Sequence, residues 1–146
     1  KAVLTMKAND TSRTYGEVNP TFTASYSGFR NSDNIASIGL SGTPSLSTGA
    51  TSSSDAGTYP ITTTTGDLAS KNYLFTALNG QLTIGKATLS VKANDANRIY
   101  GEANPAFSAT YAGFRNNENV TTIGMNGTVS STTTATGCSA ARTRFG

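Results

Sequence analysis

The stretch KAVLTMKANDTSRTYGEVNPTFTASYSGFRNSDNIASIGLSGT, residues 1–43, decides the fold because it occurs twice. It returns as KATLSVKANDANRIYGEANPAFSATYAGFRNNENVTTIGMNGT at residues 86–128, at an offset of 85 residues and without gaps. More than half of the aligned positions are identical. A repeat at this spacing indicates tandem modules that each fold as a unit. We therefore expect two modules, residues 1–85 and residues 86–146, with the second one incomplete.

The end of the second copy departs from the repeat. In the 85-residue register, GTYPI at residues 57–61 corresponds to RTRFG at residues 142–146, where only the Thr matches. We therefore expect a divergent tail from about residue 142, which a frame change, a true terminus or a cut in a longer chain would each explain. Residues 84–87 join the copies with almost no linker, which favours a semi-rigid connection.

Hydrophobic alternation predicts strands within each copy. The first strand would bury every second residue, and the same alternation follows the proline of each copy. These inward positions are Ala2, Leu4, Met6, Ala8, Phe22, Ala24 and Tyr26, and in the second copy Ala87, Leu89, Val91, Ala93, Phe107, Ala109 and Tyr111. The segment from Asn9 to Pro20 is rich in Asn, Asp and Gly and is predicted to be a turn or loop.

The dipeptide Asn79-Gly80 stands between two alternating runs, which predicts a hairpin with a type I′ turn. In that register Phe75 would face Ile84, and both would share one buried face with Tyr73. Residues 45–57 would form a long loop or an edge strand, and residues 33–40 at most a short helical turn. We expect a mainly β fold of tandem small modules, each a sandwich or a β-grasp-like sheet.

Composition excludes several classes of function. The chain has 146 residues with no His and one Cys, so it lacks a Ser-His-Asp or Cys-His nucleophile, a histidine zinc ligand and an internal disulfide. The net charge is +3, but residues 1–85 carry five positive and five negative side chains. A neutral module offers no basic stripe for nucleic acid. We expect no enzyme, no cofactor, no nucleic-acid partner and no membrane insertion.

Several motifs occur in a fixed order: LT-x-K-AND, R-x-YGE-x-NP, FTASYSGF, AGTYPIT and NYLFTALNGQLTI. This pattern resembles the MBG repeat domain of the YGX type, which is found in large bacterial extracellular and adhesin-like proteins. The resemblance covers the first copy and about two thirds of the second. It implies a small, mostly β module of secreted or cell-surface proteins, with neighbouring repeats as partners and no catalytic, cofactor or metal residues.

Two sets of residues are candidates for a site. We interpret the first set as architecture, because glycine supplies positive φ and proline fixes the start of the next strand; it comprises Tyr15, Gly16, Glu17, Asn19, Pro20, Tyr100, Gly101, Glu102, Asn104 and Pro105. The second set comprises Phe29, Arg30, Phe114 and Arg115, which are either buried or exposed as a platform for a sugar or protein. The Asn-Asp pairs at residues 9–10 and 94–95 are better explained by Asx turns than by calcium binding.

Three functions agree with these observations. The first is a non-catalytic structural repeat, a stalk or spacer in a bacterial secreted or surface adhesin-like protein. The second is an adhesive module that contacts host glycan or protein. The third is an accessory module of an extracellular enzyme. The neutral first module, the Ser- and Thr-rich composition and the absence of catalytic groups favour the first.

Overall fold

The computed structural model describes residues 1–135, which form nine strands and no helix. The mainly β fold predicted from the sequence is therefore confirmed. The chain divides into two compact units, Lys1–Ala87 and Thr88–Gly146, which we describe separately. The predicted divergent tail from about residue 142 lies outside the described residues.

Unit 1 contains two sheets. The first has the order β3-β1-β6 and comprises Ala24–Ser27, Ala2–Ala8 and Tyr73–Leu78. The second has the order β2-β7-β5-β4 and comprises Thr11–Thr14, Gly80–Gly85, Gly57–Thr64 and Ser45–Ser47.

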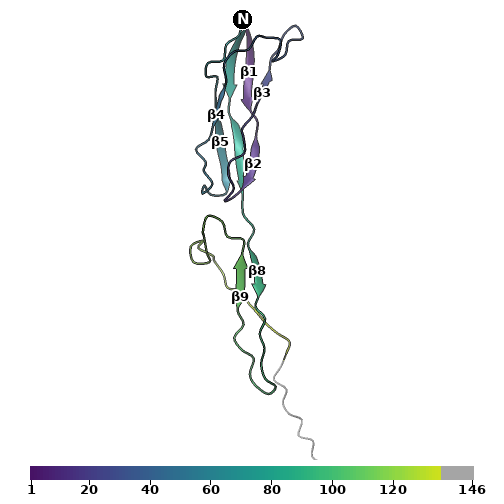
Figure 1. The fold of residues 1–146 in the computed structure, drawn as a ribbon, viewed down its shortest axis with the longest axis vertical. Coiled ribbons are helices and arrows are strands. Elements are labelled where there is room, and N and C mark those ends of the chain that lie inside the picture. The colour runs from purple at the N-terminus through teal and green to yellow at the C-terminus, as the bar shows by residue number, and fades with distance from the viewer. Residues whose placement is uncertain (136–146) are drawn as a thin grey trace, which may run out of the picture. The chain divides into compact units, whose positions relative to one another are not determined.

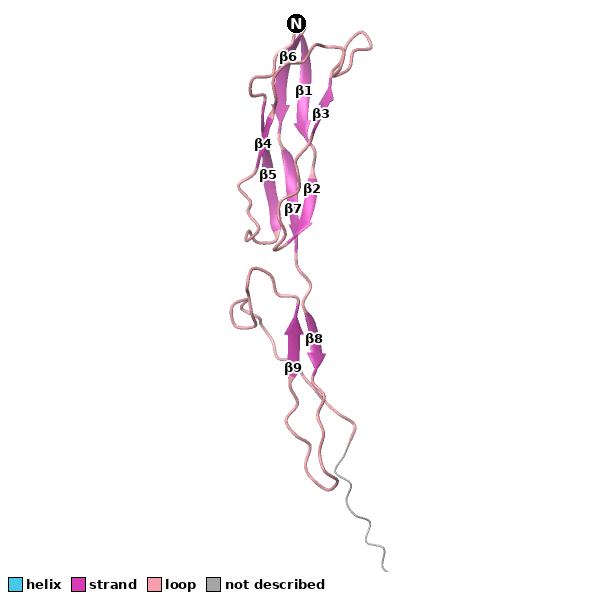
Figure 2. Ribbon diagram, in the orientation of Figure 1, coloured by secondary structure: helices cyan, strands magenta, loops and turns pink. Residues whose placement is uncertain are grey.

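Two long segments run side by side through unit 1. β1 pairs with β6 in parallel, beginning at Ala2 and Tyr73, and β2 pairs with β7 in parallel, ending at Thr14 and Gly85. β1 leads directly into β2, and β6 leads directly into β7 (Figures 1 and 2). Each segment thus leaves the first sheet and joins the second without reversing. The chain consequently enters unit 1 at one end and leaves it at the other.

The predicted hairpin at Asn79-Gly80 is wrong. β6 and β7 lie in different sheets and do not pair with each other, and neither residue has a positive φ. Gly80 is required for a different reason, because a Cβ there would lie 2.5 Å from the carbonyl oxygen of Ala8. Asn79 accepts a hydrogen bond from the backbone N–H of Thr63 at its Oδ1 (2.9 Å). The dipeptide therefore serves a strand crossing and not a turn.

The segment from Asn9 to Pro20 was predicted to be a loop, and this is wrong for β2. Its four residues become a strand because β7 lies beside them. Asp10 marks the step between sheets, where its Oδ1 accepts a hydrogen bond from the N–H of Gln81 (2.8 Å). Residues 35–39 form turns, and residues 45–56 divide between the edge strand β4 and a loop.

The core of unit 1 consists of two clusters. One contains Ala8, Ala50, Ile61, Leu82 and Ile84, flanked by Tyr15, Phe22, Leu46 and Tyr59. The other contains Leu4, Ile38 and Tyr73, flanked by Ala2, Tyr26, Phe29, Leu40 and Phe75. The predicted inward face of the first strand is confirmed, since Leu4, Met6 and Ala8 are fully buried. The predicted common face of Tyr73 and Ile84 is wrong, because their strands belong to different sheets.

Unit 2 contains the antiparallel pair β8 (Ser90–Ala93) and β9 (Ala109–Ala112). Their register places Ser90 opposite Ala112, and the same register, shifted by 85 residues, joins Thr5 to Ser27 in unit 1. The two predicted strands are confirmed over residues 90–93 and 109–112, while residues 87–89 and 107–108, also predicted as strand, are not. The predicted burial of these strands is not confirmed, because Val91 and Ala93 are exposed where their counterparts in unit 1 are buried.

Candidate functional site

The repeated YGE motif forms a tight turn after β2. Gly16 and Gly101 have φ values of 83° and 86°, as predicted for these glycines. The N–H of Glu17 donates to the carbonyl of Thr14 (3.1 Å), and Oε2 of Glu17 accepts from the N–H of Thr14 (2.9 Å). Both hydrogen bonds close the turn on itself. Tyr15 continues the ladder by donating its N–H to the carbonyl of Gly85 (2.8 Å).

A buried arginine lies beneath this turn. Arg13 is only 8% exposed, and its Nε donates to Oδ1 of Asn19 (2.7 Å). Its Nη1 donates to the carbonyl of Thr14 (3.2 Å), and its Nη2 donates to the carbonyl of Thr51. Asn19 in turn donates from Nδ2 to the carbonyl of Ala50 (2.7 Å). Because a buried charge is costly unless its donors are satisfied, this network fixes the motif to the loop after β4.

Arg13 was missed as a site residue in the sequence. The signal was present, because an Arg precedes Tyr-Gly-Glu by two positions in both copies, as Arg13 and as Arg98. A charged residue that recurs at the same position of both copies indicates a fixed polar contact.

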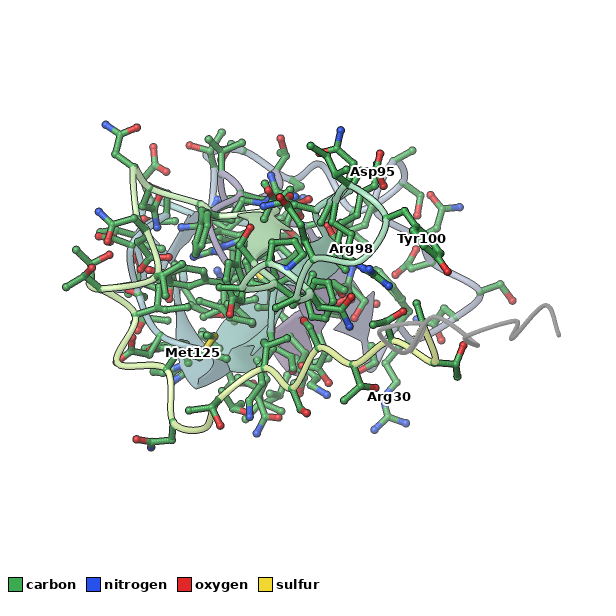
Figure 3. The ribbon with its side chains drawn as sticks, turned by 90° about the horizontal axis from the view of Figure 1, so that it is seen from below. Arg30, Asp95, Arg98, Tyr100 and Met125 are labelled. Carbon is green, nitrogen blue, oxygen red and sulfur yellow. The ribbon has the colours of Figure 1, made fainter. Side chains whose placement is uncertain are left out.

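Unit 2 keeps part of this arrangement. Asn104 donates from Nδ2 to the carbonyl of Ala135 (3.0 Å). This hydrogen bond corresponds to that from Asn19 to the carbonyl of Ala50, with both residues 85 positions later. Arg98 donates from Nη1 to the carbonyl of Glu102 (2.8 Å). Tyr100 differs from its counterpart, since it is 74% exposed and points outward (Figure 3), whereas Tyr15 packs against the core. Pro20 is half-buried and Pro105 is exposed.

The second candidate site is the loop after β3. Phe29 is half-buried and contacts Tyr73 edge to face, with ring centroids 6.4 Å apart and planes inclined at 69°. The backbone N–H of Arg30 donates to the hydroxyl of Tyr73 (2.9 Å), while the Arg30 side chain is exposed and points outward (Figure 3). Asn31 and Ser32 follow with φ values of 53° and 61°, a left-handed conformation that is uncommon outside glycine and that asparagine tolerates better than serine.

Tyr73 connects this loop to the core. Its hydroxyl donates to Oδ2 of Asp33 (2.7 Å). Burial raises the pKa of the Tyr73 hydroxyl above its ordinary value. The hydrogen bond to Asp33 and the negative charge of Asp33 raise this pKa further, whereas the hydrogen bond with the backbone of Arg30 lowers it.

The same loop is repeated in unit 2. Phe114 is half-buried and Arg115 is exposed. Asn116 and Asn117 have φ values of 50° and 59°, as at the equivalent positions of unit 1. Each unit therefore carries one exposed arginine beside two consecutive left-handed residues. The role of Phe29, Arg30, Phe114 and Arg115 in ligand contact stays a prediction.

The described residues, 1–135, contain neither a metal-ligand cluster nor a membrane-spanning helix. In that range no group of three or more His, Cys, Asp or Glu side chains is arranged to hold a metal ion. Within the same range no helix is long and apolar enough to cross a membrane. Asp10, a residue considered for calcium binding, instead accepts a hydrogen bond from the N–H of Gln81 at its Oδ1. Its Oδ2 lies 3.8 Å from Nζ of Lys7.

The repeated turn, the duplicated loop and the shared register define a tandem β-repeat protein. The MBG domain (YGX type) family matches residues 4–83 and residues 89–141, so the chain belongs to this family. MBG domains are repeat domains of extracellular proteins. No curated protein and no solved structure matches the chain significantly.

Proposed function

We propose that the chain is a non-catalytic structural repeat, a spacer in a large bacterial secreted or cell-surface adhesin-like protein. The observation that carries this proposal is the parallel course of residues 2–14 and residues 73–85 through unit 1. Because both segments cross the whole module in the same direction, the chain leaves at the end opposite to its start. A repeat built this way adds length to the protein that contains it.

The added length follows from strand geometry. Residues 2–14 are extended with one break at the step between sheets, so at about 3.3 Å per residue they cover about 40 Å. A module whose termini lay side by side would add almost nothing, however many copies were joined. The end-to-end course therefore suits a spacer.

The same strands suit a spacer that bears force. Pulling on Lys1 and Lys86 draws β1 and β2 one way and β6 and β7 the other, along the strands. The hydrogen bonds of both parallel pairs then resist together. Pulling on Lys1 and Lys71, which both precede paired strands at the same end, would instead break the β1–β6 bonds one after another.

Single-molecule force spectroscopy tests this proposal with two attachment geometries in one fold. Cysteines replace Lys1 and Lys86 in the first variant, and Lys1 and Lys71 in the second, both in a Cys138→Ser background; Cys138 lies outside the described residues. We expect a clearly higher unfolding force for the pair 1 and 86. Equal forces for the two pairs would contradict a force-bearing role.

An adhesive role is the second candidate, and the loops after β3 and β9 favour it. Left-handed residues other than glycine recur in two equivalent loops, a feature that is enriched at functional positions, and each loop presents one exposed arginine. A glycan and protein array with the intact chain tests this role, with Arg30→Ala and Arg115→Ala as variants. Binding that both variants lose, with unchanged thermal unfolding, would support adhesion, and no binding to any array member would reject it.

A further inference from the structure

The dipeptide Asn79-Gly80 combines a chemically reactive sequence with a constrained position in the fold. An asparagine closes onto the next backbone nitrogen most readily when that nitrogen belongs to glycine, because glycine has no Cβ to hinder the approach. The chain contains the Asn-Gly dipeptide twice, at residues 79–80 and at residues 126–127. The two dipeptides are embedded differently, so a single chain allows a comparison between them.

The reaction of such a dipeptide is an intramolecular acyl transfer that removes the side-chain amide. The backbone nitrogen of Gly80 loses its proton to solvent and attacks Cγ of Asn79, the bond from Cγ to Nδ2 breaks, and ammonia leaves with a proton taken from water. Water then opens the cyclic imide at one of its two carbonyls, which gives either aspartate or isoaspartate. In isoaspartate the main chain runs through Cγ and is longer by one methylene group.

The folded module holds both reacting groups in place. Oδ1 of Asn79 accepts a hydrogen bond from the backbone N–H of Thr63 in β5 (2.9 Å). Gly80 is buried and lies opposite Ile61 of β5, and a Cβ on Gly80 would lie 2.5 Å from the carbonyl oxygen of Ala8. Ring closure requires the side chain of Asn79 and the nitrogen of Gly80 to rotate toward each other, and these contacts on both residues resist that rotation.

We propose that Asn79 is a deamidation site that the fold of unit 1 keeps closed and that opening of this unit makes reactive. Asn79 itself is exposed, so water reaches the side chain and ammonia is free to leave. Protection therefore depends on the fixed geometry of the dipeptide and not on exclusion of water. It is lost when β7 separates from β5.

The isoaspartate product prevents the module from closing again. Only Asn79 lies between the end of β6 at Leu78 and the start of β7 at Gly80, so the added methylene falls at the strand crossing. β6 and β7 each keep a fixed parallel register, with β1 and with β2, and a longer connection displaces one of the two. The aspartate product keeps the length of the chain and an oxygen for the N–H of Thr63. This inference does not depend on the spacer role.

Asn126-Gly127 is the matched control within the same chain. Both residues are exposed and lie outside the strands of the part of the chain that the structure describes. A Cβ on Gly127 would meet no described atom within 4 Å, in contrast to a Cβ on Gly80. We expect Asn126 to deamidate in the folded chain.

Peptide mapping by mass spectrometry tests the proposal on the intact chain. The chain is kept at one mildly alkaline pH, either in buffer or in concentrated guanidinium chloride, and trypsin then releases residues 72–86 and residues 116–142 as separate peptides. In guanidinium chloride the two dipeptides should react at similar rates. In buffer the rate at Asn79 follows the population of opened chains, so we expect it to be about a hundredfold lower or less than in guanidinium chloride.

Two variants relate the rate at Asn79 to opening of unit 1. Arg13→Met removes the donors of a buried network and should raise the rate at Asn79 in buffer, while the rate at Asn126 stays the same. Arg30→Met removes an exposed side chain and should leave both rates unchanged.

Refolding tests the consequence of the reaction. After incubation in guanidinium chloride the chains are returned to buffer, and folded and unfolded fractions are separated. We expect isoaspartate at position 79 to collect in the unfolded fraction. The variant Asn79→Asp should refold like the unaltered chain, because it changes the side chain without lengthening the main chain.

Three results would overturn the proposal. They are a rate at Asn79 that is the same in buffer and in guanidinium chloride, an Asn79 that stays intact in guanidinium chloride, and complete recovery of the folded state by chains with isoaspartate at position 79.

Discussion

Gly80→Ala tests the strand crossing of unit 1. The new Cβ would lie 2.5 Å from the carbonyl oxygen, 2.9 Å from the carbonyl carbon and 3.0 Å from the Cβ of Ala8. Two of the three are backbone atoms, so β7 must move away from the end of β1. Overpacking of this kind costs about 2 kcal/mol. The movement also stretches the hydrogen bond from Gln81 to Asp10, which adds about 1 kcal/mol, so we expect a loss of about 3 kcal/mol in the free energy of unfolding.

Chemical and thermal denaturation followed by circular dichroism measures this loss. For a module of this size it corresponds to a fall of about 15 °C in Tm. Gly49→Ala is the matched control, because a Cβ there meets nothing within 4 Å. The variant Gly49→Ala should lie within about 0.5 kcal/mol of the unaltered chain. Equal stability of the two variants would refute the crossing of β7 over Ala8.

Two further predictions concern Arg13 and Tyr73. Arg13→Met should lower the free energy of unfolding by about 2 to 4 kcal/mol, because Oδ1 of Asn19 and the carbonyl of Thr51 lose their donor while the methionine supplies none. Tyr73→Phe should reduce the loss of stability above about pH 10. Because the pKa of Tyr73 is raised in the folded protein, the unfolded chain loses this proton first, and unfolding is favoured as the pH rises; the phenylalanine variant has no such proton. Urea titrations measure both, the second over a series of alkaline pH values.

The chain offers a control for each. Arg30→Met removes an exposed guanidinium and should change stability by less than about 0.5 kcal/mol. If Arg13→Met lowered the free energy of unfolding no more than Arg30→Met does, the buried network around Arg13 would contribute nothing to stability. Tyr26→Phe removes the hydroxyl of a half-buried tyrosine in the same core cluster. A pH dependence altered equally by both tyrosine variants would contradict the assignment to Tyr73.

Alternation within a strand could be predicted from the sequence, because it depends only on which residues face the core. Leu4, Met6 and Ala8 illustrate this success. The partner of a strand could not be predicted in the same way. Asn79-Gly80 has the composition of a tight turn, but Gly80 is there because the backbone of Ala8 approaches it, a contact across 72 positions of sequence (80 − 8 = 72).

The same limit explains β2 and the site. Thr11–Thr14 lacks a hydrophobic alternation and is a strand only because β7 pairs with it. Arg13 occupies a buried position of that strand, so its role depends on a partner strand that local sequence does not reveal. The glycine of the YGE motif was predictable, since the need for positive φ at Gly16 is a local property.

The distance across unit 1 tests the spacer account most directly. Spin labels on cysteines at positions 1 and 86, in the Cys138→Ser background, report it by pulsed electron paramagnetic resonance. The parallel course of residues 2–14 and 73–85 predicts a distance of about 40 Å, while labels at positions 1 and 71 should lie close together at one end. A short distance for both pairs would place the start and the finish of the module side by side and would contradict the account.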